Sequence, residues 1–297
     1  MIGVISYLPD DDYLRNIRVN SAKTQIEWLL NTFKYHEITV IAQNYTDDDY
    51  VLNPFVNYTK YDKGIGPASA RNIILNLFYK SEYDWLFLCD DDTTAFDYYN
   101  YKDFIYDVEC NPSKFNGIDA ISAVEPEYHP FKKQNYEDQM NLTHYKFEPR
   151  ELNSGSATSI MRNLKKYYNY ELYFPDIDAN NGEGREDMEF LMLWLKNGHT
   201  WYTMDTWIRK SLCFHKSSVF GADIKKRDEI LLKDLDVICD KYKDDGIQRV
   251  NGKITWKNFN HKYNKSKKLL YIPRAFPIEF TEKEKPKPKN TSARRLF

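Results

Sequence analysis

The sequence has little cysteine and no long apolar run. Its four cysteines (Cys89, Cys110, Cys213 and Cys239) lie far apart and form no C-x-x-C pair, which favours structural thiols in a reducing compartment. No window of about 18 apolar residues is present, so we expect no membrane-spanning helix. The chain starts with a short apolar segment that runs directly into acidic residues, unlike a signal peptide. We therefore expect a cytoplasmic protein.

The composition predicts a globular protein whose charge is unevenly distributed. The 297 residues are 42% hydrophobic and 16% aromatic, enough for one large domain with a substantial core. The net charge of −2 conceals an asymmetry, because residues 246–297 carry 14 Lys/Arg and 3 Asp/Glu (net +11) while the remainder carries 28 and 41 (net −13). Such a basic segment either meets a polyanion or docks on the acidic body of its own chain.

The first 95 residues alternate between apolar strands and amphipathic helices. We predict strands at 2–8, 37–43, 56–61 and 84–89. A helix capped by Asn20 presents Ala22, Ile26, Leu29, Leu30 and Phe33 on one face, and a second helix starts at Pro67 with Ala70, Ile73, Ile74, Leu77 and Phe78 on one face. This alternation predicts an α/β fold with a mostly parallel sheet covered by helices.

The pattern continues downstream with less regular spacing. Strands are predicted at 118–124, 156–162 and 199–209, and helices at 186–198 and 223–243. Lysine and proline dominate 281–297, which we expect to be disordered. The expected division is a catalytic domain at 1–245, a basic and aromatic extension at 246–280, and a tail at 281–297.

Three consecutive aspartates, Asp90, Asp91 and Asp92, follow the apolar strand at 84–89. Ligands of open α/β sheets bind beyond the carboxyl ends of the strands, and a cluster of oxygen ligands at such an end suits Mg²⁺ or Mn²⁺. A metal ion would also relieve the repulsion among the carboxylates. The cluster therefore predicts a divalent metal site.

Two further motifs follow, each weak by itself. Glu186 and Asp187 begin a predicted helix after the glycine-containing stretch "GEG", where the helix dipole alone would favour acidic residues. His215 in "CFHK" follows the predicted strand at 199–209, and a lone histidine is usually structural.

Taken in order, these segments resemble glycosyltransferases of the GT-A fold, and family-2 enzymes most closely. The resemblance covers residues 1–220 and rests on "GPASARNIIL", on "FLCDDD" as a D-x-D motif, on "GREDMEFLMLWLKNG" and on "CFHK". The G-x-G-x-E-D run is also similar to β-1,4-galactosyltransferases. The loop "AQNYTDDDY" lacks the aspartate with which family-2 enzymes usually read the base.

The resemblance implies a role for each motif. Asp90 and Asp92 match the D-x-D positions, which contact the ribose and the metal, and Asp91 is open to either task. His215 matches the late metal ligand, and Arg71 matches a residue near the donor nucleotide. Asp187 matches the catalytic base and Glu186 its acceptor-contacting neighbour. The implied enzyme is inverting and uses a UDP-sugar with Mn²⁺ or Mg²⁺.

The acceptor is predicted from the basic extension. Segment 249–274 interleaves Lys and Arg with aromatic residues, a composition that binds phosphates and stacks on bases. It equally suits an anionic membrane surface or a teichoic-acid-like polymer. We expect hydroxymethylated cytosine in phage DNA as the acceptor, which would place the enzyme in a host cytoplasm. The alternatives are a bacterial surface glycan or its lipid-linked precursor, and a non-enzymatic binding domain.

The last two residues, Leu296 and Phe297, are the only apolar anchors after Phe280. A short apolar tip after a Lys/Pro-rich segment resembles the peptides by which phage replication proteins bind a sliding clamp. The sequence therefore predicts a clamp as a further partner.

Overall fold

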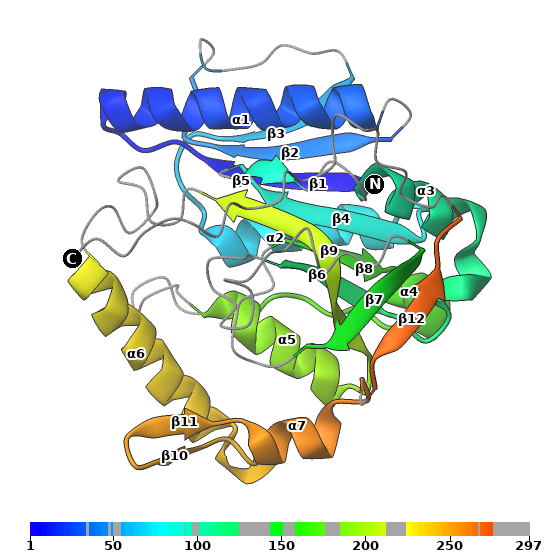
Figure 1. Ribbon diagram of the computed structural model, residues 1–297. Helices are drawn as coiled ribbons and strands as arrows, with labels where there is room; N and C mark the ends of the chain where they lie inside the picture. Colours follow the sequence, from blue (N-terminus) through cyan, green and yellow to red (C-terminus); the bar gives the residue numbers. More distant parts are fainter. Residues whose placement is uncertain are drawn as a thin grey trace, which may run out of the picture.

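The computed structural model describes residues 1–33, 36–46, 49, 55–91, 93–96, 101–124, 143–150, 158–175, 185–211, 224–266 and 268–275. Strands and helices alternate along the first part of the chain, as the sequence predicts (Figure 1). The strands are β1 (Ile2–Tyr7), β2 (Ile38–Gln43), β3 (Val56–Tyr61), β4 (Trp85–Asp90), β5 (Thr93–Phe96), β6 (Ala120–Val124), β7 (His144–Pro149), β8 (Ser159–Arg162), β9 (Trp201–Ser211), β10 (Gln248–Val250), β11 (Lys253–Thr255) and β12 (Leu270–Pro273). The helices are α1 (Asp12–Thr32), α2 (Pro67–Tyr79), α3 (Tyr101–Cys110), η2 (Pro112–Phe115), α4 (Leu164–Tyr168), α5 (Glu186–Lys196), α6 (Ile224–Lys241), η4 (Lys243–Asp245) and α7 (Lys257–Tyr263).

One mixed sheet organises the described chain. Its order is β12-β7-β9-β6-β8-β4-β1-β2-β3, and β5 pairs with β9. The four strands β4-β1-β2-β3 are parallel neighbours, and β6 is parallel to β9, while the other pairs are antiparallel. Helices cover both faces, so the predicted α/β class is confirmed. The carboxyl ends of β1, β2 and β4 therefore share one edge, on the left in Figure 1.

Alternation along the buried strands divides the core between the two faces. Val4 and Phe87 face one cluster, to which α1 and α3 contribute Leu29, Phe33, Phe104 and Val108. Ile5 and Leu88 face the other, where α2 and α5 pack. Each face of the sheet therefore has its own hydrophobic layer, and α2 and α5 lie on the same side.

Helix α1 begins earlier than the sequence predicts. It starts at Asp12, and the side chain of Asp11 caps it by accepting a 2.9 Å hydrogen bond from the Leu14 amide. The predicted cap, Asn20, lies inside the helix, so that prediction was wrong. Buried Arg18 breaks the apolar spacing on the inner face of the first turns of α1, and this explains why the pattern is visible only after Asn20.

Helix α2 begins at Pro67 as predicted, because the preceding Gly66 adopts φ 83° and proline is favoured in the first helical turn. Its buried face includes Ala70, Ile74 and Phe78, but Leu77 is 41% exposed and was wrongly assigned to this face. Arg71 is buried here instead, at 3% exposure.

Segments 246–266 and 268–275 contact the rest of the described chain. Strand β12 pairs antiparallel with β7, and Phe259 of α7 belongs to the core cluster on the α5 side of the sheet. The hairpin β10–β11 extends beyond α6 (Figure 1). In the part of the chain that the structure describes, no helix is long and apolar enough to cross a membrane.

Candidate functional site

The acidic end of β4 presents its first two aspartates to different surroundings. Asp90 is the last residue of β4 and its side chain is 19% exposed. Asp91 follows and is 1% exposed. Successive side chains of an extended segment point to opposite faces, so Asp90 meets α2 and α5 while Asp91 meets α1. Asp92 lies outside the described residues.

Asp91 is held inside the protein by α1 and β1. Its carboxylate accepts a 2.5 Å hydrogen bond from the Ser6 hydroxyl and pairs with the buried guanidinium of Arg18. Its backbone amide donates to the Ile5 carbonyl (3.0 Å), and its carbonyl accepts from the Ser21 hydroxyl (3.0 Å). The Arg18 charge compensates the Asp91 charge, and these bonds fix the backbone from which Asp90 projects.

Arg71 joins the acidic strand end to helix α5. Its guanidinium donates to both oxygens of Asp90, at 3.1 and 3.3 Å, and forms an ion pair with Glu186. Arg71 and Glu186, which are 115 positions apart in the sequence, are thus in direct contact. A planar guanidinium has donors enough to bind two carboxylates at once. Three of the segments that carry the family resemblance are therefore in contact through Arg71.

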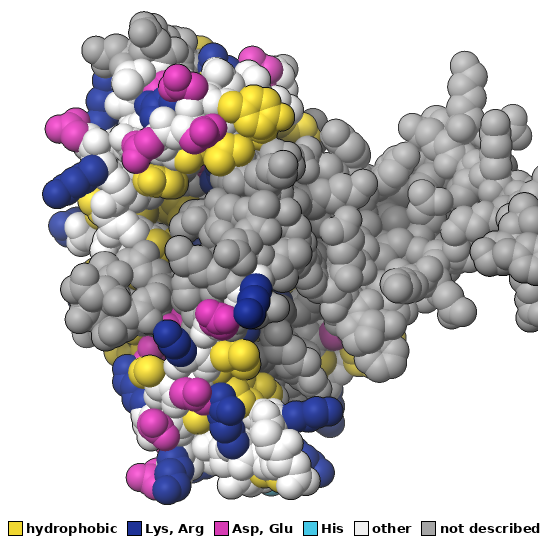
Figure 2. All heavy atoms as spheres, turned by 90° about the vertical axis from the view of Figure 1, so that its left-hand side faces the viewer, with side chains coloured by type: hydrophobic (Ala, Val, Ile, Leu, Met, Phe, Trp, Pro, Cys, Tyr) yellow, Lys and Arg dark blue, Asp and Glu magenta, His cyan; other side chains and the backbone are white. Residues whose placement is uncertain are grey.

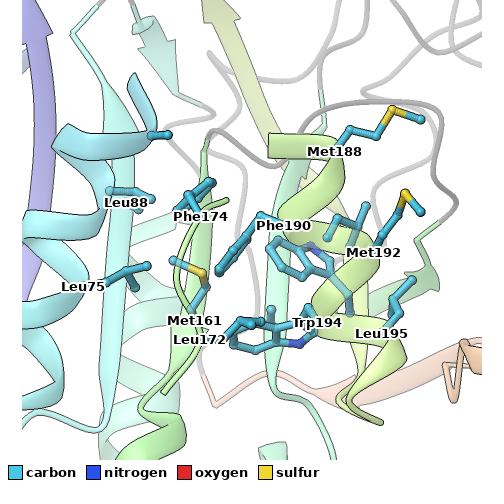
Figure 3. Close-up of a cluster of buried hydrophobic side chains, with 14 of the residues drawn as sticks. Leu75, Leu88, Met161, Leu172, Phe174, Met188, Phe190, Met192, Trp194 and Leu195 are labelled. Atoms are coloured by element: carbon cyan, nitrogen blue, oxygen red, sulfur yellow. The ribbon is translucent and has the colours of Figure 1, made fainter. Parts of the chain in front are cut away.

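The position of Arg71 is fixed by aromatic packing. Its guanidinium carbon lies 5.3 Å from the ring centre of Phe174, and the Phe174 ring stacks on Phe190 of α5 with centroids 3.9 Å apart. Figure 3 shows these two rings between Leu88 and the helix that carries Met188 and Trp194. The neighbouring carboxylates hold the pKa of Arg71 above its ordinary value despite burial. Arg71 therefore stays charged.

Glu186 and Asp187 occupy the first turn of α5, as predicted. The pKa of Glu186 is raised to about 7, mainly by burial and also by the Asp187 charge, although Arg71 opposes both. Asp187 is half-buried, and its carboxylate accepts a 2.7 Å hydrogen bond from the Met188 amide. With Asp90, the two residues make three carboxylates near one guanidinium, so the site has an excess of negative charge that suits a cation.

The C-terminal part of the chain supports α5 through contacts that were not predicted from the sequence. Glu189 is 4% exposed and accepts a 2.7 Å hydrogen bond from the Tyr242 hydroxyl as well as an ion pair from Lys241. At the other end of α5, the Lys196 ammonium lies 2.5 Å from Asp245. Glu189 lies one turn after Glu186, so these contacts fix the helix close to the site. In the sequence, the only indication of these contacts was Glu189 itself, an acidic residue three positions after Glu186.

Of the three predicted metal ligands, Asp90 lies within the described residues. Among the residues that the structure describes, no group of three His, Cys, Asp or Glu side chains lies close enough to hold a metal ion. Two predicted ligands, Asp92 and His215, lie outside the described residues. Asp90 supplies a partly exposed hard oxygen donor. Figure 2 shows the side of the molecule to which β4 points, where described acidic and basic side chains intermingle.

Comparisons with known proteins give distant structural likenesses. No protein-family model and no curated protein matches the sequence. The solved structures that match include GalNAc-T7 with UDP, GalNAc and Mn²⁺ (12% identity, TM-score 0.41, covering 71% of this chain and 43% of that one). Galactosyltransferase LgtC in complex with donor and acceptor sugar analogs matches at 10% identity and TM-score 0.32, and an active-site mutant of LgtC at 12% and 0.31; each covers 58% of this chain and 60% of the other. This chain thus spans 43–60% of the length of these structures.

Proposed function

We propose that the protein is a metal-dependent glycosyltransferase that uses a nucleotide-sugar donor. The observation that carries this proposal is the junction at Arg71, where the "ARN" helix, the acidic end of β4 and the "ED" helix meet. Each motif is weak alone. Their contact at the carboxyl edge of a parallel sheet supports one common site.

In the proposed reaction, Asp187 accepts the proton of an acceptor hydroxyl. The acceptor oxygen forms a bond to the anomeric carbon while the bond to the diphosphate oxygen breaks, and the electron pair leaves with the nucleoside diphosphate. One such displacement inverts the anomeric configuration. Glu186 orients the acceptor, and Arg71 holds Glu186 and Asp90 in register. A divalent cation bound by Asp90, Asp92 and His215 would supply charge stabilisation at the leaving phosphate.

Donor turnover by paired variants tests this assignment. The purified chain is incubated with a panel of UDP-sugars and Mn²⁺, with EDTA as the control. Asp187→Asn should leave donor affinity nearly unchanged and lower turnover by about 10²–10⁴-fold, the usual contribution of a positioned base. Asp90→Asn, Asp92→Asn and, more mildly, His215→Ala should weaken Mn²⁺-dependent donor binding itself. Full activity in EDTA rules out the metal, and a product with retained configuration rules out the single displacement.

The proposed acceptor is hydroxymethylated cytosine in DNA, with a bacterial surface glycan or its lipid-linked precursor as the alternative. The charge of 249–274 supports a polyanion, and Tyr271 is 54% exposed and available for stacking, whereas Phe259 is buried in the core. Nucleoside mass spectrometry after incubation with hydroxymethylated or plain DNA distinguishes the two. Transfer only to a glycan or lipid carrier would exclude DNA. The sliding-clamp contact through Leu296 and Phe297 falls outside the described residues and stays a prediction.

A further inference from the structure

A cavity of about 280 Å³ opens between the end of α1 and helix α3. It lies at the edge of the sheet opposite to Asp90, since the first residues of β1 and β4 form its floor. In Figure 1 the N-terminus lies beside α3 at this edge. The cavity is therefore separate from the proposed active site. It is lined by Met1, Ile2, Phe33, His36, Glu82, Tyr83, Asp84, Trp85, Phe87, Ile105, Val108, Glu109, Pro112 and Ile160.

The lining of this cavity combines an aromatic floor with an acidic rim. Phe33, Trp85 and Phe87 supply the apolar surface, while Glu82 and Glu109 lie at positions that are exposed to solvent. His36 contacts Glu109 at 2.6 Å, and the other ring nitrogen of His36 is buried without a hydrogen-bond partner among the described atoms. The Met1 amino group also lines the cavity, but burial lowers its pKa to about 6, so it is mostly uncharged at pH 7. An aromatic surface flanked by carboxylates then favours a ligand that is apolar and cationic.

The C-terminal segment of this chain has that chemistry. Residues 293–297 read "ARRLF", with two guanidinium groups next to two apolar side chains. Residues 276–280, "FPIEF", are also apolar, but they carry one acid and no base and so do not complement the acidic rim. Both segments lie outside the described residues. Charge complementarity therefore favours 293–297 over 276–280 as the occupant.

The described chain ends close enough to this cavity for the segment to reach it. The amide of Ala275 donates a 2.8 Å hydrogen bond to Asp107 of α3, the helix that also lines the cavity through Ile105, Val108 and Glu109. The strand β12 runs toward α3 in Figure 1. Seventeen residues lie between 275 and 293, and this stretch spans up to about 60 Å when extended. Tethering also raises the effective concentration of the segment near its own body.

We infer that the cavity between α1 and α3 binds segment 293–297 of the same chain. Arg294 and Arg295 pair with Glu82 and Glu109, and the apolar pair Leu296 and Phe297 covers the aromatic floor. This site is remote from Asp90, and the inference does not depend on glycosyl transfer. The basic tail would then have a binding site on the acidic body of its own chain. This site would compete with any other molecule that binds residues 293–297.

Peptide binding in trans tests the inference. In the full chain carrying Leu296→Ala and Phe297→Ala, the tail lacks the two apolar side chains proposed to occupy the cavity. This chain is titrated into a fluorescein-labelled peptide of residues 287–297 at low salt, and binding is followed by fluorescence anisotropy. The peptide should bind, and the wild-type chain should bind it at least tenfold more weakly because its own tail competes. Adding Glu82→Lys and Glu109→Lys to the first chain should also weaken binding at least tenfold.

A charge swap identifies the contact directly. The peptide with Arg294→Glu and Arg295→Glu should not bind the chain that retains Glu82 and Glu109. It should bind the chain that carries Glu82→Lys and Glu109→Lys. Glu171→Lys is the matched control, because Glu171 is a surface acid that does not line the cavity, and it should leave binding within twofold. A peptide that does not bind, or one that binds equally to the charge-reversed chain, overturns the inference.

A second variant fills the cavity without changing its charge. Val108→Trp, checked for folding by circular dichroism, should abolish binding of the same peptide. If it fails to fold, the charge swap alone decides. Sedimentation of the wild-type chain distinguishes docking within one chain from exchange between two, and only a concentration-independent monomer supports the intramolecular form. Binding of the peptide to a purified sliding clamp but not to this chain would also overturn the inference.

Discussion

Exchanging Asp91 for asparagine should destabilise the protein, whereas the same change at Asp90 should not. Asp91→Asn keeps the shape of the side chain but leaves the Arg18 guanidinium buried beside a neutral amide. Asp91 and Arg18 have side chains that are 1% and 6% exposed, so water cannot replace the lost partner. Removing one partner of a buried ion pair costs about 3–5 kcal/mol of the free energy of unfolding. We expect about 3 kcal/mol, because the amide still accepts from Ser6.

Urea unfolding followed by far-ultraviolet circular dichroism measures this cost. With a urea dependence of about 3 kcal/mol per molar, a loss of 3 kcal/mol lowers the unfolding midpoint by roughly 1 M. The urea midpoint of Asp90→Asn should stay within roughly 0.3 M of the wild-type midpoint. Asp90 is partly exposed, and Arg71 keeps other carboxylates nearby when Asp90 is neutralised. It should nevertheless lose Mn²⁺-dependent donor binding. Substitution of Asp91 should thus mainly affect stability, whereas substitution of the adjacent Asp90 should mainly affect donor binding.

A double variant checks the cause. Arg18→Met removes the unpaired charge that Asp91→Asn leaves behind, so the combined variant should be more stable than the sum of the two single effects predicts. The reasoning would be refuted if Asp91→Asn unfolded at the wild-type urea concentration. Loss of donor binding without loss of stability would instead make Asp91 a donor ligand, as the sequence left open.

Three further predictions follow from the site and the core. The folded-state pKa of Glu186 is raised to about 7 from an ordinary value of 4.5, so its contribution to stability is present below pH 4.5 and is lost as the pH rises through 7. In urea unfolding, the stability of Glu186→Gln relative to the wild type should therefore increase by about 3 kcal/mol across that pH range. Equal pH dependence of stability in the two proteins would contradict this. Glu189→Gln weakens the contact with Tyr242 and should cost about 1–2 kcal/mol in the same assay, with turnover lowered more than donor affinity because α5 carries the base. Gly3→Ala would place a methyl group 2.4 Å from a side-chain carbon of Ile74, so thermal unfolding should report a loss of about 1–3 kcal/mol; an unchanged midpoint would mean that α2 moves aside freely.

The sequence was sufficient to predict the parallel half of the sheet, because buried strands such as 85–89 are apolar runs that can be recognised without knowing which strands they pair with. The edge strand β12 and its neighbour β7 were not predicted. They are short and mix polar with apolar residues, and each is stabilised by pairing with a distant strand, β7 with β9 and β12 with β7. Local patterns contain no information on such pairings.

The candidate site shows the same division. Arg71, Asp90, Glu186 and Asp187 were all named from the sequence, because motif order and spacing identify them, and the structure brings these four together. The environment of Asp91 could not be predicted, since its partner Arg18 lies 73 positions away in a helix whose start was itself wrongly placed. The alternation of side chains along an extended segment was the one available clue that the middle aspartate turns away from its neighbours.

The pairing of β7 with β12 has a consequence for synthesis of the chain. β7 has β9 on one side, but its other edge is covered by a strand that follows 120 residues later. At 5–20 residues per second, a ribosome needs roughly 6–24 s to add those residues. During this interval the backbone donors and acceptors of β7 are exposed at an open edge, which is the kind of surface on which other chains add strands. Interrupting translation before residue 270 should therefore yield aggregates, even though the parallel half of the sheet is already complete.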